Sequence, residues 1–156
     1  MSRTIVVLAC LALLVSGVFA GENSWFDMEN CAMCKNMTSQ AGLMEHMKCE
    51  QYPISNGIVT VTNVADGYID AYRTAHAGME QTAMRIQKGE ALNICQSCQA
   101  LGMCLMKGAK QEYVKTSSGD IWILTSDDAA LVADLQNWVK RNNEEMAKLE
   151  GSSKKG

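Results

Sequence analysis

Two pairs of cysteines carry the clearest chemical signal in the sequence. Cys31 and Cys34 enclose Ala-Met, and Cys95 and Cys98 enclose Gln-Ser. An asparagine stands shortly before each pair. Because asparagine is a good N-cap, both pairs could lie on the first turn of a helix. A helix N-terminus favours the thiolate over the thiol, which makes sulfur a better metal ligand and a better nucleophile. The two pairs therefore predict either metal binding or thiol chemistry.

The metal hypothesis has two forms. In the first, His46 and Cys49 follow the first pair in the spacing Cys-x2-Cys-x11-His-x2-Cys, which suits a tetrahedral zinc site of three thiolates and one imidazole. In the second, both pairs meet in one four-thiolate site. Thiolates and the neighbouring methionines are soft ligands, so we expect zinc or copper. The candidate ligands are Cys31, Cys34, His46, Cys49, Cys95, Cys98 and Cys104.

Two other interpretations of the same thiols stay open. A dithiol at a helix start can exchange with disulfides, so Cys31, Cys34, Cys95 and Cys98 could form a redox site. Against this, no long apolar strand precedes Cys31, as a thioredoxin-like order would require. Alternatively, the six cysteines beyond Cys10 could form three disulfides that stabilise an interaction module without catalysis. We expect a metal-binding protein rather than an enzyme; if it is an enzyme, a thiol–disulfide oxidoreductase is expected.

The first 20 residues predict an export signal. A short basic start, an apolar run from Thr4 to Val18 and small residues before Gly21 place cleavage after Ala20. No later segment is apolar for long enough to span a membrane. We therefore expect an extracytoplasmic protein, periplasmic or secreted, that binds a metal ion, with another extracytoplasmic protein as a further candidate partner. The net charge of −3 and the absence of a basic run argue against nucleic acid as a partner. The oligomeric state is open.

The sequence contains an internal repeat. Residues 43–87 align with residues 105–149 without a gap and share nine of 45 positions, where about three would be expected by chance. Each copy follows a CxxC pair, so we interpret the chain as a duplication. Unit one covers about 28–90 and unit two about 91–150. Together they predict one pseudo-symmetric domain over 21–150, followed by a disordered tail at 151–156.

Each unit predicts a CxxC helix, a β-hairpin and a long α-helix. Strands are expected at 47–54 and 58–64 around an Asn-Gly turn, and at 109–116 and 120–125 around a Ser-Gly turn. Apolar stripes of helical spacing follow, from Ile69 and from Leu131. Asp66 and either Ser126 or Asp127 are expected as N-caps. The predicted fold class is α+β, with a four-stranded, mainly antiparallel sheet covered by two long helices.

Overall fold

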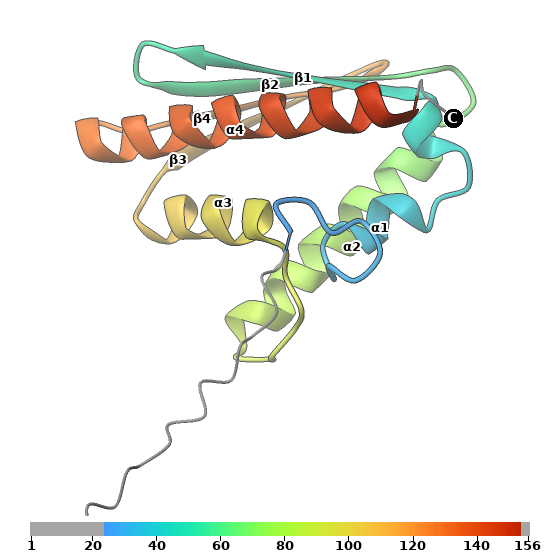
Figure 1. Ribbon diagram of the computed structural model, residues 1–156, viewed down its shortest axis with the longest axis horizontal. Coiled ribbons are helices and arrows are strands. Elements are labelled where there is room, and N and C mark those ends of the chain that lie inside the picture. Colours follow the sequence, from blue (N-terminus) through green and yellow to red (C-terminus); the bar gives the residue numbers. More distant parts are fainter. Residues whose placement is uncertain (1–23, 154–156) are drawn as a thin grey trace, which may run out of the picture.

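The computed structural model describes residues 24–153, so the expected export signal at 1–20 lies outside the described residues. Four strands form one antiparallel sheet in the order β1-β2-β4-β3. The elements are β1 (Met47–Ile54), β2 (Gly57–Val64), β3 (Lys110–Thr116), β4 (Gly119–Thr125), α1 (Lys35–Thr38), α2 (Ile69–Gln87), α3 (Gln96–Met106), α4 (Ala129–Ser153) and the 3-10 turn Leu43–Glu45. The chain is therefore a mixed α and β fold with a four-stranded antiparallel sheet (Figure 1).

The two hairpins agree with the sequence pattern to within one residue at each strand end. Gly57 and Gly119 begin the second strand of each hairpin, where the backbone of the neighbouring strand approaches closely. A Cβ at Gly57 would lie 1.9 Å from the Leu124 carbonyl oxygen, and one at Gly119 would lie 2.0 Å from the Thr62 carbonyl oxygen. Any side chain would therefore push β2 and β4 apart, and only glycine fits at either position.

The central strands pair in a register that matches the sequence repeat. Thr60 of β2 lies opposite Trp122 of β4, and these two positions are equivalent in the alignment of the two copies. In consequence, replacing each residue of a pair by its equivalent in the other copy gives a pair of the same ladder. The central pair, Thr60 and Trp122, gives itself. Gly57 opposite Thr125 corresponds in this way to Gly119 opposite Asn63.

Helix α4 packs along one face of the sheet, against β1 and β2 (Figure 1). Leu131, Leu135 and Val139 bury its apolar stripe against Ile58 and Leu124. The helix starts beside Asp128, whose Oδ1 accepts the Ala130 N–H at 2.8 Å, so the N-cap is Asp128 and not Ser126 or Asp127 as expected. Helix α4 continues to Ser153 and therefore enters the segment 151–156 that we expected to be a tail. None of the described helices has the length and hydropathy of a membrane span.

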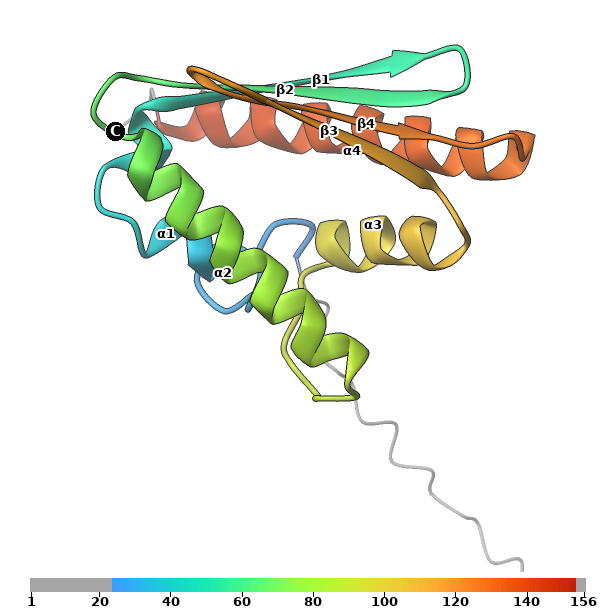
Figure 2. The same cartoon turned by 180° about the vertical axis from the view of Figure 1, so that it is seen from behind.

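Helix α2 takes a different path from α4. Its first turns reach the second hairpin, where Arg73 Nη2 donates to the Thr116 and Gly119 carbonyls at 3.2 and 2.8 Å. It then runs away from the sheet beside α1 (Figures 1 and 2). Gly78 allows this contact, because a Cβ there would lie 2.3 Å from Asn36 Oδ1. The expected cover of the sheet by two long helices is therefore not confirmed for α2. The helix also begins without a side-chain cap, so Asp66 does not serve as one.

Candidate metal centre

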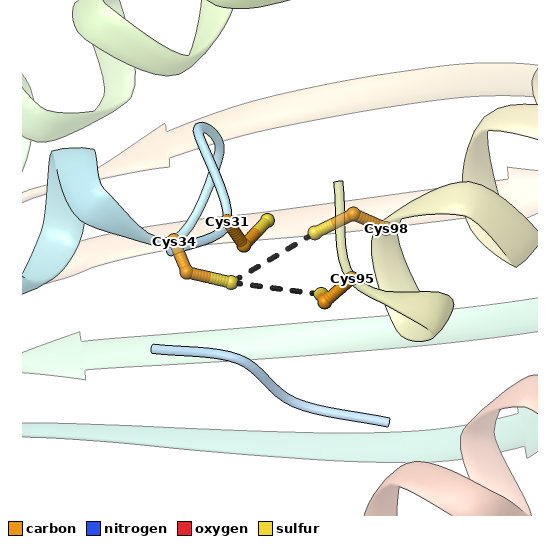
Figure 3. Close-up of side chains that lie close together, drawn as sticks. All are labelled: Cys31, Cys34, Cys95 and Cys98. Carbon is orange, nitrogen blue, oxygen red and sulfur yellow. Dashed lines mark hydrogen bonds between the residues drawn. The ribbon is translucent and has the colours of Figure 1, made fainter. Parts of the chain in front are cut away.

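The two CxxC pairs lie side by side, although 60 residues separate them in the chain. The four sulfur atoms of Cys31, Cys34, Cys95 and Cys98 all lie within 4.8 Å of one another (Figure 3). Cys34 Sγ is 3.8 Å from Cys95 Sγ and 4.0 Å from Cys98 Sγ. These two contacts join a cysteine of the first pair to cysteines of the second. Four cysteines are thus close enough to bind one metal ion.

Helix starts and backbone hydrogen bonds hold the pairs in place. Cys95 is the N-cap residue of α3 with an extended backbone, and its carbonyl accepts the Gln99 N–H at 3.0 Å. Cys34 directly precedes α1. The Ala32 N–H, between the cysteines of the first pair, donates to the Asn93 carbonyl at 2.8 Å and ties the two loops together. The expected position at helix starts is therefore present, but the N-cap residues are the cysteines themselves.

The sulfur geometry fits a tetrahedral metal ion. Four thiolates bound to one zinc ion at about 2.3 Å have sulfur atoms about 3.8 Å apart. The measured 3.8 and 4.0 Å lie close to that value, and no sulfur pair of the cluster has to move far to reach it. Cys31 and Cys95 are buried, whereas Cys34 and Cys98 are partly exposed. A metal ion could therefore enter from the side of Cys34 and Cys98.

The four thiols share protons unequally. Hydrogen bonds from Cys34, Cys95 and Cys98 stabilise the Cys31 thiolate and lower its pKa. The bond with Cys31 raises the pKa of Cys95, but bonds with Cys34 and Cys98 outweigh it and bring that pKa down to about 6. Hydrogen bonds with Cys31 and Cys95 raise the pKa of Cys34, and those with all three other cysteines raise the pKa of Cys98. Four thiolates this close repel one another, so a divalent cation is what would allow all four to ionise.

A buried polar network supports the second pair. Ser97, between Cys95 and Cys98, is only 4% exposed, and its Oγ donates to Asn142 Oδ1 at 2.9 Å. The indole N–H groups of Trp25 and Trp138 donate to Asn142 Oδ1 and to Ser97. Asn142 Nδ2 then reaches Gln51 of β1 at 2.9 Å. The start of α3, which carries two of the sulfurs, is therefore fixed to both α4 and the sheet.

The other three residues predicted as ligands lie apart from this cluster. His46 is exposed; its ring stacks on Tyr68 with centroids 4.0 Å apart, and its Nδ1 is 2.8 Å from the Gly42 carbonyl oxygen. Cys49 is exposed on β1. Cys104 is buried in α3 among core side chains, where burial raises its pKa. Among the described residues, the four-cysteine group is the one that could hold a metal ion.

All six cysteines of the described residues are free thiols. Of the two cysteines outside the CxxC pairs, Cys49 is exposed on β1 and Cys104 is buried on α3, and neither forms a disulfide. The interpretation based on three structural disulfides therefore has no support in this geometry.

A second cluster of ionisable side chains lies between α2 and the second hairpin. Asp120 of β4 is 2% exposed, and the hydroxyl groups of Tyr72 and Tyr113 both donate to its Oδ2. Arg73 Nη1 and His76 Nε2 lie 3.9 and 4.0 Å from the same oxygen. Burial and the bond to Asp120 raise the pKa of Tyr72, and they raise that of Tyr113 to about 12. The Asp120 carboxylate is thus surrounded by two hydroxyl donors and the positive charge of Arg73.

The sequence analysis missed the residues that support both clusters. Asn142 falls within the otherwise apolar stripe of α4, and Asp120 lies on the inward face of β4 together with Trp122 and Leu124. A polar residue at a position predicted to be buried needs hydrogen-bond partners. The presence of polar residues at such positions could therefore have identified Asn142 and Asp120. Ser97 could have been identified only from its place between two cysteines.

Comparisons of the chain with protein-family models, with curated proteins and with solved structures found no significant match. The function therefore has to be argued from the residues of the site. Their donor set, four thiols from two loops, is that of a candidate four-thiolate metal centre.

Proposed function

We propose that the protein binds one zinc ion through Cys31, Cys34, Cys95 and Cys98. The observation that carries the proposal is the convergence of four sulfur atoms, within 4.8 Å of one another, from two distant segments. Tetrahedral sets of four thiolates are typical of zinc and of iron–sulfur centres, and soft thiolate ligands also bind Cu(I). His46 is not part of the proposed site.

The proposed centre is structural or storage-related rather than catalytic. Catalytic zinc sites keep one coordination position open for water or substrate, whereas structural sites fill all four positions with protein ligands. Here four cysteines would fill the shell, and two of them are buried. The zinc ion would hold the segment before the first hairpin against the start of α3, and so would join the two halves of the chain.

We also propose that the two halves arose by duplication and that the protein is exported. Support for duplication comes from the ladder register, in which Thr60 opposite Trp122 makes equivalent residues meet at the centre of the sheet. Support for export comes from the basic and apolar N-terminal pattern of residues 1–20. In an oxidising compartment, a bound metal would protect the four thiols from disulfide formation.

Thiol–disulfide exchange at the same cysteines is a second candidate function. It is favoured by Cys95, which caps α3 and has a pKa of about 6. In that reaction two thiols of the protein would be oxidised to a disulfide while the disulfide of a partner protein is reduced to two thiols.

Metal analysis of three forms of the protein tests the proposed function. Wild type should contain about one zinc ion per chain, since one tetrahedral site is present. Cys34→Ser should lose the metal, whereas Cys49→Ser should keep it, because Cys49 is a free cysteine outside the cluster. A metal-free wild type whose cysteines cycle readily between dithiol and disulfide would instead establish the redox function.

A further inference from the structure

Among the described residues, no helix covers one of the two faces of the sheet. Figures 1 and 2 show α2, α3 and α4 on the same side of the sheet. Ile58 of β2 and Leu124 of β4 point to that side, where they pack against α4. Because side chains alternate along a strand, the neighbouring positions point to the other side. That outer face has four β-branched apolar side chains at its centre: Val59, Val61, Ile121 and Ile123.

Two further apolar side chains extend this centre to the edge strands. Tyr52 of β1 pairs with Val59 and is 50% exposed, and Val114 of β3 pairs with Ile121 and is 49% exposed. We name these six residues the outer apolar strip. Its four central side chains are partly exposed, and its two edge side chains are exposed. Contiguous apolar surface of this kind marks an interaction site more often than scattered apolar residues do.

The charges on the outer face lie only on the edge strands, and they cancel. Lys48 and Glu50 belong to β1 and form an ion pair at 2.9 Å. Lys110 and Glu112 occupy the equivalent positions on β3. Each edge therefore carries one positive and one negative side chain. A surface with this pattern repels neither itself nor a neutral partner.

We propose that the outer apolar strip binds a second copy of this chain, so that two sheets pack face to face in a symmetric dimer. In a two-fold arrangement with aligned strands, the strand register places Glu50 over Tyr52 or over Val114 of the second copy. Glu112 meets Val114 or Tyr52 in the same way, so no charge lies over a like charge. The apolar centre of one face then packs against the apolar centre of the other.

The size of the face is sufficient for such a dimer. Four strands spaced by about 4.8 Å, with about seven or eight residues each at about 3.3 Å, cover roughly 500 Å² of flat area. Two copies would then bury about 1,000 Å² or more, which is the lower limit for a specific interface.

Sedimentation equilibrium of the purified chain tests the proposal. We expect a dimer at about 50 μM protein. Ile121→Lys should raise the dissociation constant of the dimer by at least about 30-fold, as for a central interface residue. Val59→Thr with Ile123→Thr keeps the β-branched shape and removes apolar surface, so it should also weaken the dimer even if the lysine variant fails to fold. Met84→Lys replaces an apolar residue on α2 that is as exposed as Tyr52, and it should leave dimerisation unchanged.

Two results would overturn the dimer. One is a wild-type chain that is monomeric up to about 100 μM, because its self-association would then be weaker than that of specific interfaces of this size. The other is a dimer whose dissociation constant is the same in wild type and in both outer-face variants. Metal content and circular dichroism, measured on each variant, verify that it is folded.

Discussion

Two clusters of ionisable side chains in the described part of the chain, the four cysteines and the group around Asp120, differ in whether they need a ligand. The four thiols of Cys31, Cys34, Cys95 and Cys98 are like groups held within 4.8 Å, so their thiolates would repel one another. Asp120, by contrast, is a single buried carboxylate that receives two tyrosine hydroxyl bonds and lies near Arg73 and His76.

This difference separates a candidate metal centre from a structural network. The Asp120 cluster supplies its own hydrogen bonds and positive charge, and so it can stabilise the fold without a ligand. The cysteine cluster consists of four thiols, and a divalent cation would compensate the negative charge of their thiolates. Perturbation of the metal should therefore affect the first cluster alone, and perturbation of Asp120 the second.

Removal of the metal should have the largest effect on stability. Because the ion would join two segments that lie far apart in the sequence, chelation should lower the free energy of unfolding by several kcal/mol and Tm by more than about 10 °C. Thermal unfolding with and without a zinc chelator, monitored by circular dichroism, measures the change. An unchanged Tm after the metal has been removed would show that the centre does not hold the halves together.

Metal affinity should depend steeply on pH. Cys34 and Cys98 have raised pKa values and hold their protons at neutral pH, whereas the pKa of Cys95 is about 6 and that of Cys31 is lowered. Zinc should therefore displace about two protons near pH 7.5 and about three below pH 6. In the first range the zinc affinity should fall by about 100-fold for each unit that the pH is lowered.

Calorimetric titration with zinc in buffers of different ionisation enthalpy gives the number of protons released. Cys49→Ser should release the same number as wild type, since Cys49 lies outside the cluster. A release of fewer than one proton at neutral pH would contradict the assignment of Cys34 and Cys98 as protonated ligands.

Asp120→Asn should destabilise the fold and leave metal binding unchanged. The amide keeps the size of the side chain but removes the buried charge that faces Arg73, at a cost of about 2 kcal/mol in the free energy of unfolding. Chemical denaturation measures this cost, and a zinc titration of the same variant verifies the metal affinity. Asp134→Asn, which breaks an exposed ion pair with Lys107, is the matched control and should cost at most about 0.5 kcal/mol.

Ser97→Ala should weaken metal binding by about 10-fold, because the start of α3, which carries Cys95 and Cys98, loses its hydrogen bond to Asn142. Competition with a chromogenic zinc chelator measures the affinity. Ser39→Ala removes an exposed serine hydroxyl and should have no effect. Equal affinities for Ser97→Ala and wild type would show that the network does not position the sulfurs.

His46→Ala should change the metal affinity by less than about 2-fold, because the imidazole stacks on Tyr68 and is outside the four-cysteine group. The same chelator competition gives the value. A large loss would restore the mixed site of three thiolates and one imidazole.

Local patterns account for most of the fold and for part of the site. The Asn56-Gly57 and Ser118-Gly119 turns and the alternation around them predicted all four strands, because hairpins are determined by short-range sequence. The direction of α2 could not be predicted in this way, since it depends on the contact between Gly78 and Asn36, which lie on different helices. The pairing of two CxxC motifs was one of two metal hypotheses, and the spacing to His46 and Cys49 was equally compatible with the other. Only the tertiary fold separates them, since it brings Cys34 to Cys95 and leaves His46 on Tyr68.

X-ray absorption at the zinc edge of the purified wild-type protein tests the central claim most directly. A four-thiolate centre predicts four sulfur neighbours at about 2.3 Å and no nitrogen neighbour. Three sulfurs with one nitrogen, or a protein without bound metal, would contradict the assignment of Cys31, Cys34, Cys95 and Cys98 as the ligands.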